Sequence, residues 1–287
     1  MTAVFKHELK SYFHSFPTYL FCAFLLVLVG VGALLYNIQS AVANFELVLQ
    51  LVSLGLVVLV PILTMRSIAE EKKQKTDQLL YSLPLKGGQI VLGKYFALLA
   101  VFLLPMIIVC IYPLIFAKFG EVYLPTSYGS IIAFYFMGAA LIAIGLFLSS
   151  LTENIGVAAG ISIAFMLLNY YLVPLAEYVS KTAMGSLIAV FVIILLFGIL
   201  MEHLTKSAIL SYGIAFIIAI AAAIAYRTDN AIFEGLLPNV MSKISLFDRF
   251  NDFVNGVFDL TSIVFYVTVA AFFLFAAVQS LEKRRYN

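Results

Sequence analysis

The stretch LVLQLVSLGLVVLVPILTMRSIAEEKKQKTDQLLYSLPLKGGQIVLGKYFALLAVFLLPMIIVCIYPLIFA (47–117) decides the fold class of this chain. It holds two runs that contain no charged residue, Leu47–Met65 and Tyr95–Ala117, on either side of a charged segment, Arg66–Lys94. A helix needs about 20 apolar residues to cross the hydrocarbon core of a bilayer. Both runs meet that length. The stretch therefore predicts two membrane-spanning helices joined by a loop outside the membrane.

The rest of the chain repeats this pattern and predicts an all-α polytopic membrane protein with eight membrane helices. Hydrophobic residues make up 63% of the 287 residues and charged residues 11%, against about 45–50% and about 25% in soluble domains. The unbroken runs also exclude a transmembrane barrel, whose strands alternate apolar and polar residues. The other six runs are Pro17–Tyr36, Thr126–Phe147, Asn154–Ala176, Thr182–Met201, Ser207–Tyr226 and Leu260–Leu281.

The distribution of Lys and Arg predicts the orientation, because loops that remain in the cytoplasm are enriched in these residues. With a cytoplasmic N-terminus and eight spans, 12 of the 17 Lys and Arg residues fall inside and 5 outside. We therefore expect both termini to be cytoplasmic. Only Glu202–Lys206 separates the sixth and seventh runs. Residues 182–226 are accordingly two spans or a re-entrant hairpin, and their length favours spans.

Two segments have amphipathic helical patterns outside the spans. In residues 1–16, five apolar residues (Phe5, Leu9, Tyr12, Phe13, Phe16) share one face and polar residues the other. This predicts a helix lying on the cytoplasmic leaflet. In the outer segment 227–259, Phe247, Phe250 and Val254 belong to an apolar face, which we expect to meet lipid or a partner's helices. That helix is either a surface connector or a lid over an exit path.

The segment Arg66–Lys94 combines dense mixed charge with apolar residues at helical spacing and ends its helix at Pro84. It is either a solvated loop or a docking helix for a cytoplasmic partner. The apolar residues at helical spacing favour docking. Gly88–Lys94 matches the start of a phosphate-binding loop, G-x-x-x-x-G-K, but Tyr95 stands where Ser or Thr would hold Mg²⁺. We therefore expect no nucleotide to bind at this motif.

Motifs typical of catalysis or metal binding are absent from the sequence. No cluster of Cys and His has the spacing of a metal site, and the predicted spans contain almost no ionisable residue. A proton- or sodium-coupled secondary transporter would need such residues and internal repeats. Among the mild polar groups in the spans, Asn169 is a candidate for the substrate path, although helix packing explains it better.

The charged segment resembles the first cytoplasmic loop of the ABC-2 type permease family, the membrane subunits of many bacterial ATP-binding-cassette exporters. That loop reads approximately R-x-I-A-x-E, then Thr, L-L-x-S-x-P and Gly-Lys. One departure is Lys75, which stands where many members have Gly. Ser149–Gly160 is also similar to the family, and Gly256–Arg285 resembles its gliding-motility type. The matching residues are Arg66, Ile68, Ala69, Glu71, Thr76, Leu79, Leu80, Ser82, Pro84, Gly93 and Lys94.

The resemblance implies one transmembrane domain over residues 1–287, similar to type V exporters. It would have an elbow helix (1–16), a cytoplasmic coupling helix (66–86) and six family spans. The remaining residues, 182–226, would form an inserted helix pair or hairpin. The chain would have no catalytic site and bind no cofactor or metal. Coupling to the ATPase would involve Arg66, Glu70, Glu71, Thr76, Leu79, Leu80, Tyr81 and Pro84, with Lys72 and Lys73 at the rim.

The same resemblance implies the partners and the reaction. Two cytoplasmic ATPase subunits that bind ATP and Mg²⁺ would dock beneath two permease chains, as a homodimer or heterodimer in the bacterial cytoplasmic membrane. An extracytoplasmic auxiliary subunit could join them. The expected function is export of an amphipathic or hydrophobic substrate, with Phe247, Phe250 and Val254 as an outer gate. The alternatives are a membrane scaffold or signal-transmitting subunit that does not transport, and a secondary transporter.

Overall fold

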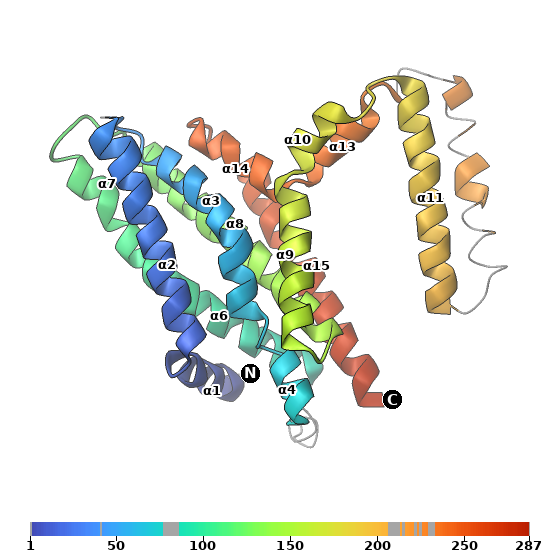
Figure 1. The fold of residues 1–287 in the computed structure, drawn as a ribbon, viewed down its shortest axis with the longest axis horizontal. Coiled ribbons are helices and arrows are strands. Elements are labelled where there is room, and N and C mark those ends of the chain that lie inside the picture. The colour runs from blue at the N-terminus through green and yellow to red at the C-terminus, as the bar shows by residue number, and fades with distance from the viewer. Residues whose placement is uncertain are drawn as a thin grey trace. The chain divides into compact units, whose positions relative to one another are not determined.

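The computed structural model describes residues 2–40, 42–76, 86–205, 213, 216–220, 223, 226–228 and 233–286, without the side chains of 196–205 and 284–286. The described residues form helices and connecting turns, with no strand among them. They divide into two compact units, one of residues 1–170 and 246–287 and one of residues 171–245. In chain order, the first unit holds α1 (Thr2–Phe13), α2 (Phe16–Ala33, followed by a π-helical turn at Leu34–Gln39), α3 (Glu46–Thr64), α4 (Ala69–Gln74), α6 (Gly87–Val109), α7 (Ile111–Phe116), α8 (Leu124–Leu151), α9 (Ile155–Tyr170), α14 (Leu246–Val254) and α15 (Leu260–Tyr286) (Figure 1).

Five helical segments of the described chain are long and apolar enough to cross a membrane: Phe16–Gln39, Glu46–Gln74, Gly87–Phe116, Leu124–Leu151 and Leu260–Lys283. They correspond to five of the predicted runs. The predicted run Asn154–Ala176 holds two helices, α9 and α10 (Leu172–Tyr178), which together make a sixth candidate, either a broken span or a re-entrant loop. The break lies just before Pro174, which has no N–H to continue the helical hydrogen bonds. The chain thus has five or six apolar spans in its described part.

Helix α8 forms the centre of the first unit. In its most apolar window 78% of the residues are buried within the chain, against 28–61% in the other four spans. Two glycines on this helix permit close packing of its neighbours. A Cβ on Gly138 would lie 2.3 Å from the Phe102 ring of α6, and one on Gly145 would lie 2.3 Å from Oγ1 of Thr64 in α3. The core is therefore built around α8, with α3, α6, α9 and α15 packed on it.

Helix starts follow from short polar residues and proline in the connections. Asn154 caps α9, because its Oδ1 accepts the N–H of Gly156 at 2.9 Å. Asp259 caps α15 by accepting the N–H groups of Thr261 and Ser262. Proline lies in the first turn of α2 and of α8, where its missing N–H costs no helical hydrogen bond.

Both ends of the chain lie at the same end of the first unit as α4 (Figure 1). At the start of α6, a Cβ on Gly87 would lie 3.1 Å from the side chain of Glu282 near the end of α15. Two turns further along α6, Gly93 lies against Val4 of α1. Hence α1, the start of α6 and the end of α15 meet at one end of the bundle.

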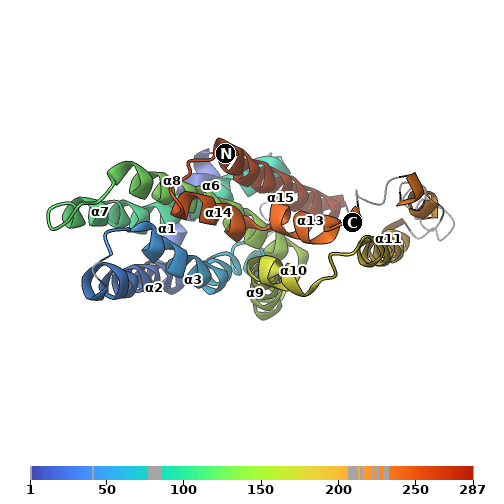
Figure 2. The same ribbon diagram turned by 90° about the horizontal axis from the view of Figure 1, so that it is seen from above.

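Helix α14 lies at the opposite end of the unit (Figure 1), where it packs on α3 and α8 and is seen from above in Figure 2. Gln50 in α3 donates to Oδ1 of Asn251 at 3.1 Å, and the Ser130 hydroxyl of α8 donates to the carbonyl of Phe253 at 2.9 Å. The loop that carries 66–76 and the amphipathic helix of 227–259 are therefore at opposite ends of the unit.

The second unit holds α10, α11 (Ala183–Thr205) and α13 (Leu236–Ile244), with α10 packed on α13. Gly235 has a positive φ of 66°, and its N–H donates to the carbonyl of Lys181 at 3.0 Å, which links the segment after α10 to the start of α13. The part of α11 whose side chains are described, Ala183–Leu195, is apolar. Most of the predicted run Ser207–Tyr226 lies outside the described residues.

Candidate functional site

The N-terminus of α4 is capped by a serine from the end of α8. The Ser149 Oγ accepts the N–H of Ala69 at 3.1 Å and that of Ile68 at 3.3 Å, and its hydroxyl donates to the carbonyl of Met65 at 3.1 Å. Capping satisfies backbone donors that a helix cannot pair internally. Next to it, the carbonyl of Ser150 accepts the ammonium of Lys72 and the hydroxyl of Ser280. The start of α4 is thus fixed to the central helix.

The C-terminus of α4 ends in a left-handed turn at Lys75, whose φ is 59°. The N–H of Thr76 donates to the carbonyl of Glu71 at 3.0 Å and the N–H of Lys75 to that of Lys72 at 3.2 Å. These two bonds are the Schellman pattern, in which glycine is the usual residue at the left-handed position. This explains why a glycine suits the position, and it shows that the turn forms with lysine in its place.

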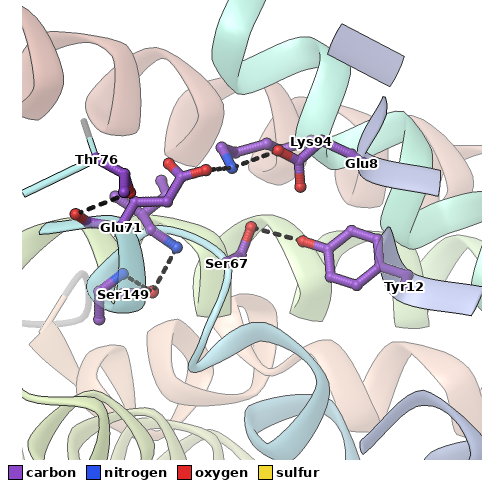
Figure 3. A network of polar contacts seen from close by, with 9 residues as sticks. Glu8, Tyr12, Ser67, Glu71, Thr76, Lys94 and Ser149 are labelled. Carbon is purple, nitrogen blue, oxygen red and sulfur yellow. Dashed lines mark hydrogen bonds and ion pairs between the residues drawn. The ribbon is translucent and has the colours of Figure 1, made fainter. Parts of the chain in front are cut away.

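A buried lysine joins α4 to two other helices (Figure 3). The Lys94 Nζ in α6 lies 2.8 Å from Oε1 of Glu8 in α1 and 2.6 Å from Oε1 of Glu71 in α4. Lys94 is only 1% exposed. A buried charge is tolerated when it is paired and hydrogen-bonded, and here one ammonium serves two carboxylates. We call these three residues, Glu8, Glu71 and Lys94, the ion triad.

The residue before Lys94 allows α1 to approach. A Cβ on Gly93 would lie 2.8 Å from Cγ1 and 3.0 Å from Cβ of Val4, which is closer than side-chain atoms normally come. The Gly-Lys pair therefore has two linked roles. Gly93 leaves room for α1 against α6, and Lys94 then reaches the carboxylate that α1 presents.

A tyrosine adds a second contact between α1 and the residues before α4. The Tyr12 hydroxyl donates to Oγ of Ser67 at 2.9 Å, and both side chains are buried (Figure 3). Burial raises the pKa of the Tyr12 phenol, partly opposed by the positive charge of Lys94. The phenol therefore keeps its proton and remains a donor at neutral pH. Together with the ion triad, this bond ties α1, α4 and α6 into one polar junction.

The predicted coupling residues separate into three groups. Glu71 belongs to the ion triad, and the hydroxyl of Thr76 donates to the carbonyl of Glu71. Arg66 is exposed, and Glu70 is half-buried with Gln74 donating to its carboxylate at 3.3 Å. Leu79, Leu80, Tyr81 and Pro84 lie outside the described residues.

One detail of the sequence interpretation needs correction. Lys72 was expected at an exposed rim, but it is 5% exposed and bonded to Ser150, whereas Lys73 is exposed. Glu71, a predicted coupling residue, places its carboxylate against Lys94 of the same chain. A helical wheel could not show these partners, because both come from distant parts of the sequence.

The apolar face of α14 packs inside the chain and not against lipid. Phe250 is 1% exposed and meets the Phe134 ring edge-on, with 5.7 Å between centroids. Phe247 is 5% exposed and meets Tyr170 in the same way at 5.1 Å, while Val254 is half-buried. The expectation that this face meets lipid or a partner's helices is therefore wrong for the two phenylalanines. The pattern alone does not distinguish a face that meets lipid from one that meets neighbouring helices.

Asn169 has a structural contact of its own. It is 7% exposed, and its Oδ1 accepts the N–H of Leu246, the first residue of α14, at 3.0 Å. The Tyr266 hydroxyl of α15 donates to the carbonyl of the same leucine at 3.0 Å. Asn169 thus holds the start of α14, which is the helix-packing role that the sequence favoured.

Sequence reasoning missed Glu8, Ser149 and Ser67 as members of the junction. Glu8 had a readable signal, since it lies four residues from Val4 and from Tyr12 and so falls on the buried face of α1. A charged residue on that face suggests a buried partner. Ser149 and Ser67 had no comparable signal. In the same region, Gly88–Lys94 forms the first turns of α6 and not a phosphate-binding loop.

The described residues contain no group of three or more His, Cys, Asp or Glu side chains placed to hold a metal ion. A search of curated proteins found no match for this chain. A scan of protein families matched the one described as "ABC-2 family transporter protein" over residues 28–176, just over half of the chain. The match includes Glu71, Lys94 and Ser149, and it joins the motif of the charged loop to the apolar helices around it. The chain therefore belongs to the ABC-2 family of transporter proteins and is a multi-pass membrane component of that family.

Proposed function

We propose that the chain is the permease subunit of an ATP-binding-cassette exporter, energised by separate cytoplasmic ATPase subunits that dock on residues 66–86. The observation that carries this proposal is the anchoring of α4. Its start is capped by Ser149 of the central helix, and Glu71 in its middle is ion-paired to Lys94 of α6. A segment that only linked two spans would not need such contacts.

The junction offers a path for force. A push on α4 from the cytoplasm would reach α8 through Ser149, α6 through Lys94 and α1 through Glu8. Because close-packed helices shift as units between discrete arrangements, these helices would move together. ATP and Mg²⁺ would bind on the ATPases, and this chain would contribute no catalytic group.

In this assembly two permease chains pair above two ATPases, in the bacterial cytoplasmic membrane. The excess of Lys and Arg predicted inside supports cytoplasmic termini, as does the shared location of both chain ends and α4 (Figure 1). The apolar helices favour an amphipathic or hydrophobic substrate. We retain eight spans as the proposal for the full chain, with residues 182–226 crossing twice. Labelling of a single cysteine at Thr205 from the cytoplasm alone would support it, and labelling only from outside would indicate a hairpin.

The experiment is gentle purification of the tagged chain from its native membrane, followed by identification of the co-eluting chains. We expect an ATPase whose hydrolysis is measurable in the complex. Leu79→Asp or Leu80→Asp should release it, because buried apolar anchors dominate such interfaces. Lys73→Ala, an exposed change in the same segment, is the matched control and should retain it. Membrane insertion of each variant is checked by the yield of monodisperse protein.

An ATPase that stays bound in both leucine variants, with unchanged hydrolysis, would refute docking at 66–86. ATP-dependent efflux from vesicles then tests transport. A bound ATPase without efflux of any amphipathic substrate would favour the non-transporting scaffold.

A further inference from the structure

A polar cavity of about 470 Å³ adjoins the ion triad. It lies where α1 meets α2 and where α3 leads into α4. The His, Glu and Arg side chains in its lining are His7, Glu8, His14, Arg66, Glu70 and Glu71. Its volume is in the range of about 300–1,000 Å³ typical of sites for small ligands. A cavity with this volume and this lining is suited to a small charged ligand.

The cavity lies at the ends of two apolar helices. Pro17 and Thr18 from the first turn of α2 and Ile62 and Leu63 from the last turn of α3 form part of its wall. Both helices are long and apolar enough to span a membrane, and we therefore expect their ends at the cavity to lie at the membrane surface. A lipid can reach this level sideways from the bilayer, with its headgroup in the cavity and its acyl chains beside α2 and α3.

The lining of the cavity carries both signs of charge. Its carboxylates are those of Glu8 and Glu71 in the ion triad and that of Glu70 on α4. Its guanidinium is that of Arg66, which is exposed and makes no hydrogen bond or ion pair with the described residues. The cavity therefore offers carboxylate oxygens that can accept from a cation and guanidinium N–H groups that can donate to an anion.

We propose that this cavity binds the headgroup of a zwitterionic phospholipid with a primary amine, such as phosphatidylethanolamine. The phosphate would meet Arg66, whose planar donors match phosphate oxygens. The ammonium would meet the carboxylate of Glu70 and those of Glu8 and Glu71, which also line the cavity. A choline headgroup has no N–H to donate to these carboxylates, and an anionic glycerol headgroup has no cation for them.

The test is the binding of three lipids with identical acyl chains to the purified chain in mild detergent. Phosphatidylethanolamine, phosphatidylcholine and phosphatidylglycerol are titrated, and bound lipid is counted by native mass spectrometry. We expect phosphatidylethanolamine to bind most tightly. Arg66→Gln and Glu70→Gln should each weaken it about tenfold, as for the loss of one charge-assisted contact. Arg66→Lys keeps the charge and should retain part of the affinity.

The matched controls are Lys10→Gln and Glu121→Gln, which remove exposed charges outside the cavity and should leave binding unchanged. Equal binding of the three lipids, tighter binding of phosphatidylglycerol, or unchanged binding in both cavity variants would overturn the proposal. Loss of a co-purifying ATPase in the cavity variants, with lipid binding intact, would assign the cavity to a loop of that protein instead. The lipid titration needs no ATPase, so its outcome is independent of the proposed transport function.

Discussion

Replacing Lys94 with methionine should destabilise the chain more than any other loss of a single charge in the described residues. The change keeps the length of the side chain but leaves Glu8 and Glu71 without their shared cation. Their oxygens lie no more than 5.4 Å apart, which is the sum of the 2.8 and 2.6 Å distances to Nζ. At an effective dielectric constant of about 20, two unit charges at that distance repel by about 3 kcal/mol.

Breaking a buried ion pair by removing one partner costs about 3–5 kcal/mol. The side chain of Glu71 is 25% exposed, and solvent therefore screens part of the repulsion, so we expect the lower end of this range. The free energy of unfolding is measured by chemical denaturation of the purified chain in detergent.

Two further variants separate the ion triad from general effects of the substitution. Lys86→Met makes the same change at an exposed position at the start of α6 and should alter stability by no more than about 0.5 kcal/mol. Adding Glu8→Gln and Glu71→Gln to Lys94→Met removes all three charges and should restore much of the loss. Equal stability of the Lys94 and Lys86 variants would refute the reasoning.

Three more predictions follow from the same end of the chain and from α15. Gly93→Val should lower the free energy of unfolding by about 1–3 kcal/mol, because the new side chain overpacks against Val4. It should also make α1 accessible to added protease. Gly88→Ala should have neither effect, because Gly88 has open space around it. Lys75→Gly should raise the free energy of unfolding by about 1 kcal/mol, because glycine adopts the left-handed turn without steric cost; an unchanged or lower value would count against that turn. Hydrogen bonds from Ser262 and Thr261 lower the pKa of Asp259, so its cap should stabilise α15 above pH of about 4 and lose that effect as the pH falls through the lowered pKa. The melting temperature of Asp259→Asn should therefore lie below that of the wild type at neutral pH and converge with it in acid, and a constant difference would contradict this.

The spans could be predicted from sequence because lipid imposes a length and a composition on each helix separately. Five runs, beginning with Pro17–Tyr36, each correspond to one helical segment that is long and apolar enough to cross a membrane. The run Asn154–Ala176 was predicted as one helix, and its break at Tyr171 could have been expected from Pro174. The residue at which the helix bends depends on tertiary packing, and a hydropathy pattern carries no information about packing.

The junction could be predicted only in part, because its bonds join residues far apart in the chain. Glu71 and Lys94 were recognised as members of a motif, yet nothing in their spacing showed that they pair with each other. The distance in sequence between Lys94 and Glu8 is larger still. The apolar face of α14 shows the converse problem, since a correct helical pattern for Phe247 and Phe250 did not reveal which surface covers them.

The structure also gives a physical reason for the residue types in the charged loop. A loop between two spans needs only polar residues to remain in water, and many sequences would satisfy that need. Here Glu71 and Lys94 close an ion pair, Gly93 leaves space for α1, and Lys75 occupies a turn that favours glycine. Tertiary contacts, and not solubility, explain Glu71, Gly93 and Lys94, whereas the backbone angle at Lys75 would suit glycine better. A segment specified in this way is held at one position on the bundle, and a partner that displaces it must move the helices to which it is bonded.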